Sequence, residues 1–201
     1  MCASEPPRVS VPRAAWLALA VLLALGWTLG AGAAGRDEEH EKLAEMYTVA
    51  GRMADPASDN HNPAMAAYFY FRAAAGGHAP SLAALWELAR GGEPHARFRL
   101  GILLQAGKGL PRDLSAAAGW WRMAAEQGLG EAQLGLAGLY RDGLGVPADP
   151  VQAYLWFSLA EAQGEAGAKE GREELTRGLS AAQIADGERL AREWRATRTS
   201  D

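Results

Sequence analysis

Cysteine is almost absent from this 201-residue sequence, and basic residues are not in excess. Cys2 is the only cysteine, so an internal disulfide and a zinc site built on cysteine pairs are both excluded. Lys and Arg number 20 against 24 Asp and Glu, which leaves a formal net charge of −4. A mildly acidic chain lacks the basic surface that binding to a phosphate backbone needs. We therefore expect no nucleic-acid partner.

The familiar catalytic motifs are also missing. The H-E pair at 40–41 begins like the zinc-protease motif H-E-x-x-H, but Ala44 stands at its last position. The S-D-N triplet at 58–60 is one element of serine β-lactamases, yet the chain has neither S-x-x-K nor K-T-G. The G-K-G at 107–109 lacks the spacing of a phosphate-binding loop. No two histidines stand four residues apart, as on a helical metal site. We predict no enzymatic activity, cofactor or metal site.

The first 33 residues have the three-part pattern of a secretory signal peptide. Arg8 and Arg13 precede an apolar run at 14–27, and the small residues Ala31-Gly32-Ala33 follow it. We place cleavage after Ala33, which predicts a periplasmic or secreted protein. The alternative is an uncleaved anchor, since residues 14–35 carry no charge and are long enough to cross a bilayer. The body would then be periplasmic and held at the inner membrane by this segment alone.

What the sequence does contain is a repeat. Residues 96–128 match residues 132–164 at a constant offset of 36. Each unit reads as two helices around a turn, with apolar residues at i, i+4 and i+8 in the first helix. Glycine favours the left-handed backbone conformation that ends this helix, and aspartate caps the start of the second helix. The residues that we expect to be structural signatures pair as Gly107 with Gly143, Gly109 with Gly145, Asp113 with Asp149, and Trp120 with Trp156.

The remaining segments extend this array on both sides. A weaker copy lies upstream at an offset of 51, and its excess of 15 residues predicts a short extra helix. Because one extra helix reverses the up-down phase of an array, that helix could lie outside the stack. Ser180 and Gln183 form a capping-box pattern that begins a final helix. The units are a divergent first repeat (37–77), an inserted helix (78–92), two repeats (93–128 and 129–164) and C-terminal capping helices (165–201).

Helices of this length are marginal alone and must stack on their neighbours. The pattern Ala–x3–Leu–[Gly/Ala]–x2–[Leu/Tyr]–x2–Gly–x–Gly–[Val/Leu]–Pro–x–Asp–x3–Ala–x2–Trp at 96–163 resembles the Sel-one-like repeat (SLR) family, relatives of the tetratricopeptide repeats. The resemblance implies an all-α fold, an α-solenoid of antiparallel helix pairs wound as a right-handed superhelix. It also implies an adaptor that binds proteins, on a concave face lined by the first helix of each pair.

The resulting hypothesis is an exported scaffold that mediates protein–protein interaction in the bacterial cell envelope. Two alternatives stay open: a periplasmic regulator of a membrane sensor or polysaccharide pathway, and a hydrolase acting on cell-wall material. Trp120 and Trp121 are adjacent, so they cannot both face inward on one helix, and we expect Trp121 to be available to a partner. The other candidates for partner binding are Arg97, Arg99, Gln133 and Arg141.

Overall fold

The computed structural model of the protein describes residues 33–198, in which there are nine helices and no strand. Apolar spacing and caps set the helix bounds, and connections of three to seven residues join most of the helices. The helices are α2 (Ala33–Ala54), α3 (Pro63–Ala75), α4 (Ala79–Arg90), α5 (Pro94–Ala106), α6 (Leu114–Glu126), α7 (Gly130–Asp142), α8 (Pro150–Ala162), α9 (Ala168–Thr176) and α10 (Ala181–Arg198).

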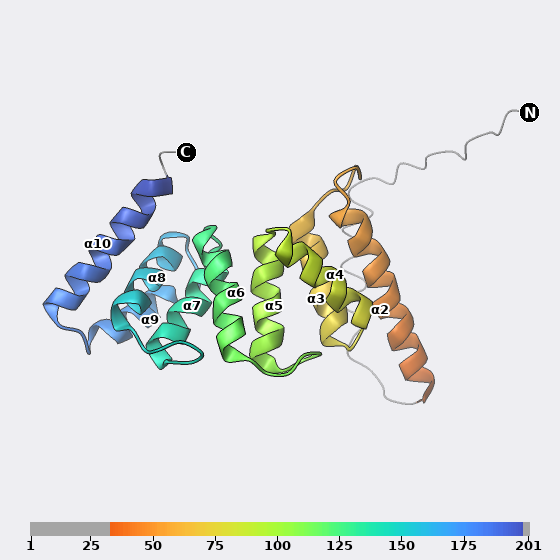
Figure 1. Cartoon of the computed structure of the whole chain (residues 1–201), viewed down its shortest axis with the longest axis horizontal. Coiled ribbons are helices and arrows are strands. Elements are labelled where there is room, and N and C mark those ends of the chain that lie inside the picture. The colour runs from red at the N-terminus through yellow and green to blue at the C-terminus, as the bar shows by residue number, and fades with distance from the viewer. Residues whose placement is uncertain (1–32, 199–201) are drawn as a thin grey trace, which may run out of the picture.

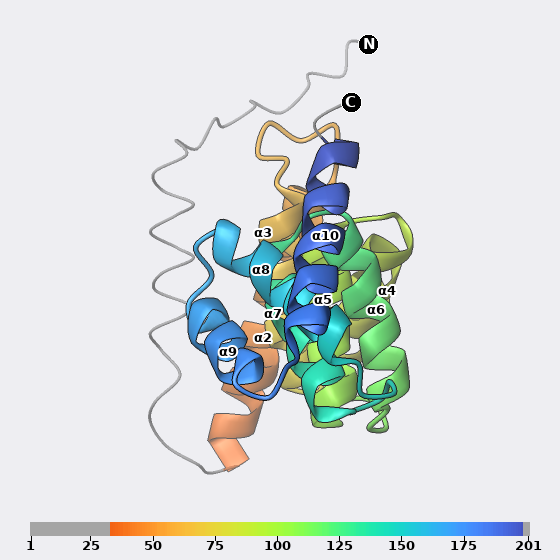
Figure 2. The same ribbon diagram turned by 90° about the vertical axis from the view of Figure 1, so that its left-hand side faces the viewer.

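The helices follow one another along the long axis, from α2 at one end to α10 at the other (Figure 1). Each packs mainly on helices close to it in the chain, most extensively in the pairs α5–α6 and α7–α8. Seen from the α10 end, this final helix lies across the end of the array (Figure 2). The predicted helical solenoid is therefore confirmed.

The turns within the two repeats have the geometry that the sequence predicts. Gly107 and Gly143 end their helices in the left-handed conformation, each with φ of +67°. Only glycine adopts this conformation without a steric cost. Asp113 accepts a hydrogen bond from Ala116 N at 2.9 Å, and Asp149 accepts one from Gln152 N at 3.0 Å. These bonds satisfy free N–H groups at the start of α6 and α8.

Alanine and large aromatic side chains alternate in the core. Ala96, Ala117 and Ala153 are fully buried, and the helices approach closely at these positions. Trp121 of α6 packs between α5 and α7, where a Cβ added to Gly101 or Gly135 would meet its ring. Gly171 of α9 stands in the same relation to Phe157, 36 residues further on. α9 is therefore a shortened first helix of one more unit.

The inserted helix α4 lies within the array and packs against both α3 and α5. Arg97 Nε donates to Ala89 O at the end of α4, at 3.0 Å. In the next unit, Gln133 Nε2 donates to Ala125 O at the end of α6, at 3.2 Å. Both pairs are related by the offset of 36. Relative to α5, α4 therefore occupies the place that α6 occupies relative to α7, although α3 also contacts α5 directly.

The C-terminal helix begins as the sequence predicts. Ser180 N donates to Gln183 Oε1 at 3.0 Å and Gln183 N donates to Ser180 Oγ at 3.3 Å, which completes the capping box. The predicted signal peptide falls almost entirely on residues 1–32, outside the described residues. Within 33–198, no helix combines the length and apolar character that crossing a bilayer requires.

Candidate partner-binding site

The prediction that Trp121 is available to a partner is wrong. Its side chain is only 5% exposed, and its indole Nε1 donates to Phe98 O at 2.9 Å. The space between Gly101 and Gly135 admits this ring, so Trp121 turns inward. Its neighbour Trp120 is the half-buried member of the pair, and its ring contacts Trp86 of α4 with centroids 5.4 Å apart.

Gln133 is buried and structural, which corrects its assignment as a partner-binding side chain, whereas Arg97 is half-buried and also hydrogen-bonded within the array. Gln133 is fully buried, and besides its bond to α6 its Oε1 accepts from Gln163 Nε2 at 2.7 Å. Arg97 donates to Gln127 Oε1 at 3.0 Å. The offset of 36 relates Gln127 to Gln163 as it relates Arg97 to Gln133. The same interaction is thus built twice, and it holds each first helix to the helices on either side.

Arg141 is exposed, and its guanidinium makes two hydrogen bonds to the neighbouring Asp142, at 2.7 and 2.9 Å. These bonds raise the pKa of Arg141 and lower the pKa of the Asp142 carboxyl. The pair is largely neutralised within itself. Arg141 therefore remains accessible but does not offer an unpaired positive charge.

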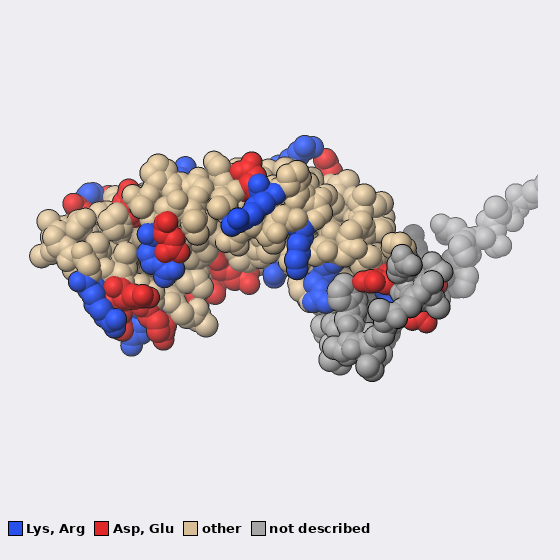
Figure 3. Space-filling model, turned by 90° about the horizontal axis from the view of Figure 1, so that it is seen from below, with Lys and Arg blue, Asp and Glu red and all other residues tan. Residues whose placement is uncertain are grey.

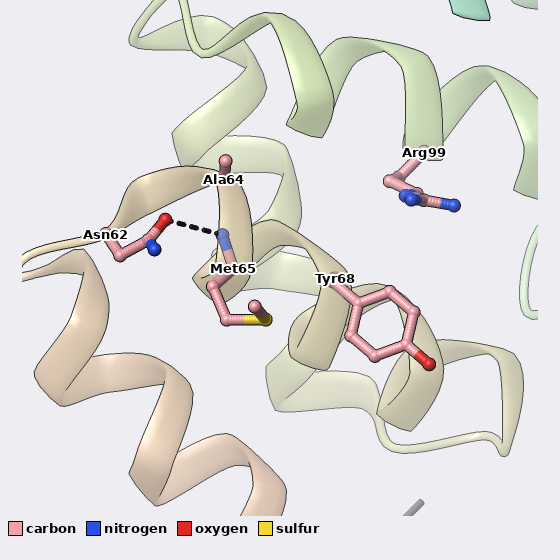
Figure 4. Close-up of a pocket in the computed structure, with 5 residues that line it drawn as sticks. All are labelled: Asn62, Ala64, Met65, Tyr68 and Arg99. Carbon is pink, nitrogen blue, oxygen red and sulfur yellow. Dashed lines mark hydrogen bonds between the residues drawn. The ribbon is translucent and has the colours of Figure 1, made fainter. Parts of the chain in front are cut away.

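Arg99 is the candidate that the structure places at a cavity. The cavity is open and about 390 Å³ in volume, and Figure 4 shows its lining residues: Asn62, Ala64, Met65, Tyr68 and Arg99. The first four lie at the start of α3, and Arg99 reaches them from α5. Asn62 caps α3 through its Oδ1, which accepts from Met65 N at 3.0 Å, so its side-chain amide nitrogen takes no part in the cap.

The Arg99 guanidinium lies among three aromatic rings. Its central carbon is 5.5 Å from the ring centroids of Tyr68 and Phe71, and 5.8 Å from that of Phe98. Such contacts hold the planar group by cation–π attraction. Its Nε is buried and has no hydrogen-bond partner among the described residues. A buried donor left in this way costs about 1–3 kcal/mol.

At this cavity, the contact between α3 and α5 differs from the corresponding contact in the repeats. Arg99 corresponds to Gly135 at the offset of 36, and Tyr68 corresponds to Gly119 at the offset of 51. Two of the five residues that line the cavity thus stand at positions where the next unit has glycine. Sequence reasoning picked Arg99 but missed Asn62, Met65 and Tyr68. The available signal was this local break in the repeat, and repeat matching discards it.

Charge is unevenly distributed along the array. Residues 62–125 contain seven Lys and Arg against three Asp and Glu, a net of +4. The three acids are all engaged: Glu87 with Arg90, Glu93 with His95, and Asp113 as a helix cap. The face in Figure 3 is mostly uncharged, with small groups of either sign. Arg99 therefore lies in a positive section that has no spare carboxylate of its own.

One pair of side chains has a superficially catalytic geometry. His78 Nδ1 lies 2.7 Å from Ser81 Oγ, at the start of α4. Ser81 is fully buried, so its hydroxyl cannot reach a substrate. The pair closes the first turn of a helix. No cluster of three potential metal ligands occurs within residues 33–198.

Helix pairs stacked in chain order define an α-solenoid repeat protein. The cavity at Arg99 is a place where this solenoid differs from its own repeat. Three segments, residues 59–78, 94–129 and 130–165, match the family model of the Sel1 repeat. The chain therefore contains Sel1 repeats in three places, which confirms the resemblance to the Sel-one-like repeat (SLR) family drawn from the sequence. Proteins with Sel1 repeats mediate protein–protein interactions, and the family is typically non-catalytic. The extra helix α4 falls between the first two matched segments.

Two solved structures are similar to this chain. One is a protective antigen of uropathogenic Escherichia coli strains with an SLR fold, 30% identical with a TM-score of 0.55 over 90% of this chain. The other is a Sel1 repeat protein from Oxalobacter formigenes, 30% identical with a TM-score of 0.53 over 68% of this chain. This chain covers 45% and 39% of their respective lengths. No curated protein matches the chain.

Proposed function

We propose that the protein is an exported adaptor that holds a protein partner in the bacterial cell envelope, using the seam between α3 and α5. The observation that carries this proposal is the cavity at Arg99, whose guanidinium lies among three aromatic rings and makes no ion pair within residues 33–198. Protein partners are bound through a few anchoring side chains, and arginine and tyrosine are enriched among them. A solenoid supplies such a surface on a rigid frame.

Export rests on the sequence of residues 1–33, with its basic flank, apolar run and small-residue ending. The E. coli neighbour is described as a protective antigen, a description that fits a surface or exported protein. The part that Sel1 repeat proteins play in protein–protein interaction supports the adaptor role. A regulator of a membrane sensor would use the same surface, and the identity of its partner would reveal it.

The experiment is crosslinking in the native cell, followed by mass spectrometry of the purified chain and its N-terminal sequencing. We expect the mature chain to begin at Ala34, to fractionate with the envelope, and to crosslink repeatedly to one envelope protein through α3 or α5. A chain that keeps Met1 and fractionates with the cytoplasm would contradict export. Crosslinks spread over many unrelated proteins, or cleavage of cell-wall material by the purified chain, would contradict the adaptor role.

A further inference from the structure

We propose that the cavity at Arg99 binds a carboxylate side chain, an Asp or Glu within an extended segment of the partner protein. This inference rests on the proposed adaptor function and names the chemistry of its partner. Three observations carry it: the geometry of the guanidinium, the chemistry of the walls, and the charge of the surrounding section.

The guanidinium is oriented before any ligand arrives. The ring centroids of Tyr68 and Phe71 of α3 and of Phe98 of α5 lie 5.5 to 5.8 Å from its central carbon, so cation–π attraction holds it among the three rings. Its edges carry the N–H donors, and a carboxylate fits two of them side by side. Arg99 makes no ion pair within residues 33–198. Most of the ion pairs in these residues join neighbouring turns of one helix. The guanidinium is thus held in place by the three rings, and its two terminal nitrogens remain available.

The walls favour a carboxylate on a peptide over a free inorganic anion. Met65, Tyr68 and Ala64 offer apolar surface beside the guanidinium, which suits the methylene groups of Asp or Glu and a neighbouring apolar residue. The Asn62 amide group, free of the cap bond, supplies a second donor at the other side of the cavity (Figure 4). The cavity is open, so a segment can pass across it while one side chain enters.

The charge of the section favours an acidic segment. The net of +4 over residues 62–125 attracts negative charge, whereas residues 126–198 carry 12 acids against eight bases and would repel it. An acidic segment would therefore be guided to the middle of the array and away from its C-terminal part. Arg122 is the nearest analogue in the next unit. Its guanidinium lies 5.8 Å from the Tyr140 ring centroid, but it is exposed and hydrogen-bonded to the Tyr140 hydroxyl.

The test is selection of random twelve-residue peptides displayed on phage against the full chain, with counter-selection against Arg99→Gln. We expect enriched peptides to share one Asp or Glu next to an apolar residue. Replacing that acid by its amide should weaken binding about tenfold or more, the loss expected for a charge-assisted bidentate pair. Arg99→Gln should weaken binding equally, and the two changes together should cost no more than either alone.

Two further variants separate the site from general charge and from folding. Arg122→Gln removes the same charge and the same Arg–Tyr contact outside the cavity, and it should leave binding within about twofold. Asn62→Asp keeps the helix cap, because Asn and Asp cap equally well, but places a carboxylate in the cavity. It should abolish binding while the melting temperature is retained. Circular dichroism of every variant checks folding.

Enriched peptides without a shared acid, equal losses from Arg99→Gln and Arg122→Gln, or no peptide that prefers the wild-type chain would each overturn the site. Failure of the site and failure of the proposed function remain distinguishable. A partner captured in cells and retained by Arg99→Gln would support the adaptor and reject the carboxylate site. Peptides that bind at Arg99, with no partner captured in cells, would support the carboxylate site and reject the adaptor.

Discussion

Trp121 shows how single glycines decide which side chains are available at the surface. A Cβ at Gly101 would overlap its indole, and a Cβ at Gly135 would lie 2.9 Å from its Cε3. In the next unit Ala137 replaces Gly101 and Phe157 replaces Trp121. The smaller aromatic ring is thus matched by the larger of the two small residues, so the total side-chain volume at this contact is similar in the two units.

This contact predicts opposite effects for two chemically identical substitutions. Gly101→Ala should lower the free energy of unfolding by about 1–3 kcal/mol, because the added methyl group overpacks the Trp121 ring. Gly119→Ala should raise it by about 0.5–1 kcal/mol, because the new Cβ meets open space and alanine favours the helix. Urea denaturation measures both. A stabilising Gly101→Ala would show that the indole has room to move.

Gln133 leads to a second prediction at the same scale. Gln133→Leu keeps the size of a fully buried side chain but removes its bonds to Ala125 O and Gln163 Nε2. We expect a loss of about 1–2 kcal/mol in unfolding free energy, since buried polar groups lose their partners. Arg141→Ala, at an exposed pair, should stay within about 0.5 kcal/mol. Equal melting temperatures for the two variants would contradict a structural role for Gln133.

Sequence reasoning at the level of residues succeeded where the interaction is local. The caps at Asp113 and Asp149 and the left-handed glycines were predictable, because each depends on three or four consecutive residues. Trp121 and Gln133 were misassigned, because their partners lie on helices that are distant in the chain. Periodicity could not decide which of two adjacent tryptophans turns inward. The gap between Gly101 and Gly135 decides it.

Among the elements, α4 and α10 cover the repeat in the same way. Trp86 of α4 meets Trp120 edge-on, at 78° and 5.4 Å between centroids. Trp194 of α10 meets Trp156 at 73° and 6.4 Å. In both helices an arginine four residues later lies over the tryptophan of the same helix, Arg90 over Trp86 and Arg198 over Trp194. Each repeat tryptophan thus packs on a tryptophan from a helix that lies outside the segments matched to the repeat.

This similarity was only partly predictable. The existence of both helices followed from the sequence, and so did the start of α10 at its capping box. The place of α4 did not, because the offset of 51 aligns α3 with the second helix of a repeat. Its place follows from the hydrogen bond of Arg97 to Ala89 O, which the printed sequence does not reveal.

The attachment of α9 to α8 leads to a prediction about pH. Arg172 donates to Glu161 across the two helices at 2.6 Å, and this hydrogen bond lowers the pKa of the Glu161 carboxyl. A lowered pKa in the folded state means that the stabilisation is complete above the ordinary pKa of glutamate. It is lost as pH falls through the lowered pKa.

Glu161→Gln should therefore reduce the unfolding free energy by about 0.5–1 kcal/mol at neutral pH. The difference from wild type should shrink as the pH falls through the lowered pKa of Glu161, because the wild-type carboxyl then becomes neutral as well. Glu173→Gln, which removes an exposed pair at 4.0 Å within α9, is the control and should have no measurable effect at either pH. A difference between Glu161→Gln and wild type that grows in acid would reject this account.

For the whole molecule, the 36-residue repeat determines how the helices stack, but it does not determine how charge is distributed over them. The sections flanking residues 62–125 carry net negative charge, with six acids against two bases at 38–61. A repeat needs only its apolar positions to stack, so surface charge is free to vary from unit to unit. The basic middle section is thus a property of this chain, and the family fold does not require it.

This distribution predicts how binding responds to salt. If an acidic segment is guided to the middle section, its association rate constant should fall steeply between about 0.02 and 0.3 M NaCl, as the Debye length shortens from roughly 20 to 6 Å. The dissociation rate constant should change much less, since it depends on the contact at Arg99 within the cavity. Stopped-flow fluorescence with a peptide from the display selection measures both. Lys108→Gln, which removes one exposed charge of the section, should reduce the slope of the association rate against salt. An association rate independent of salt would mean that only the cavity, and not the charge of the section, selects the segment.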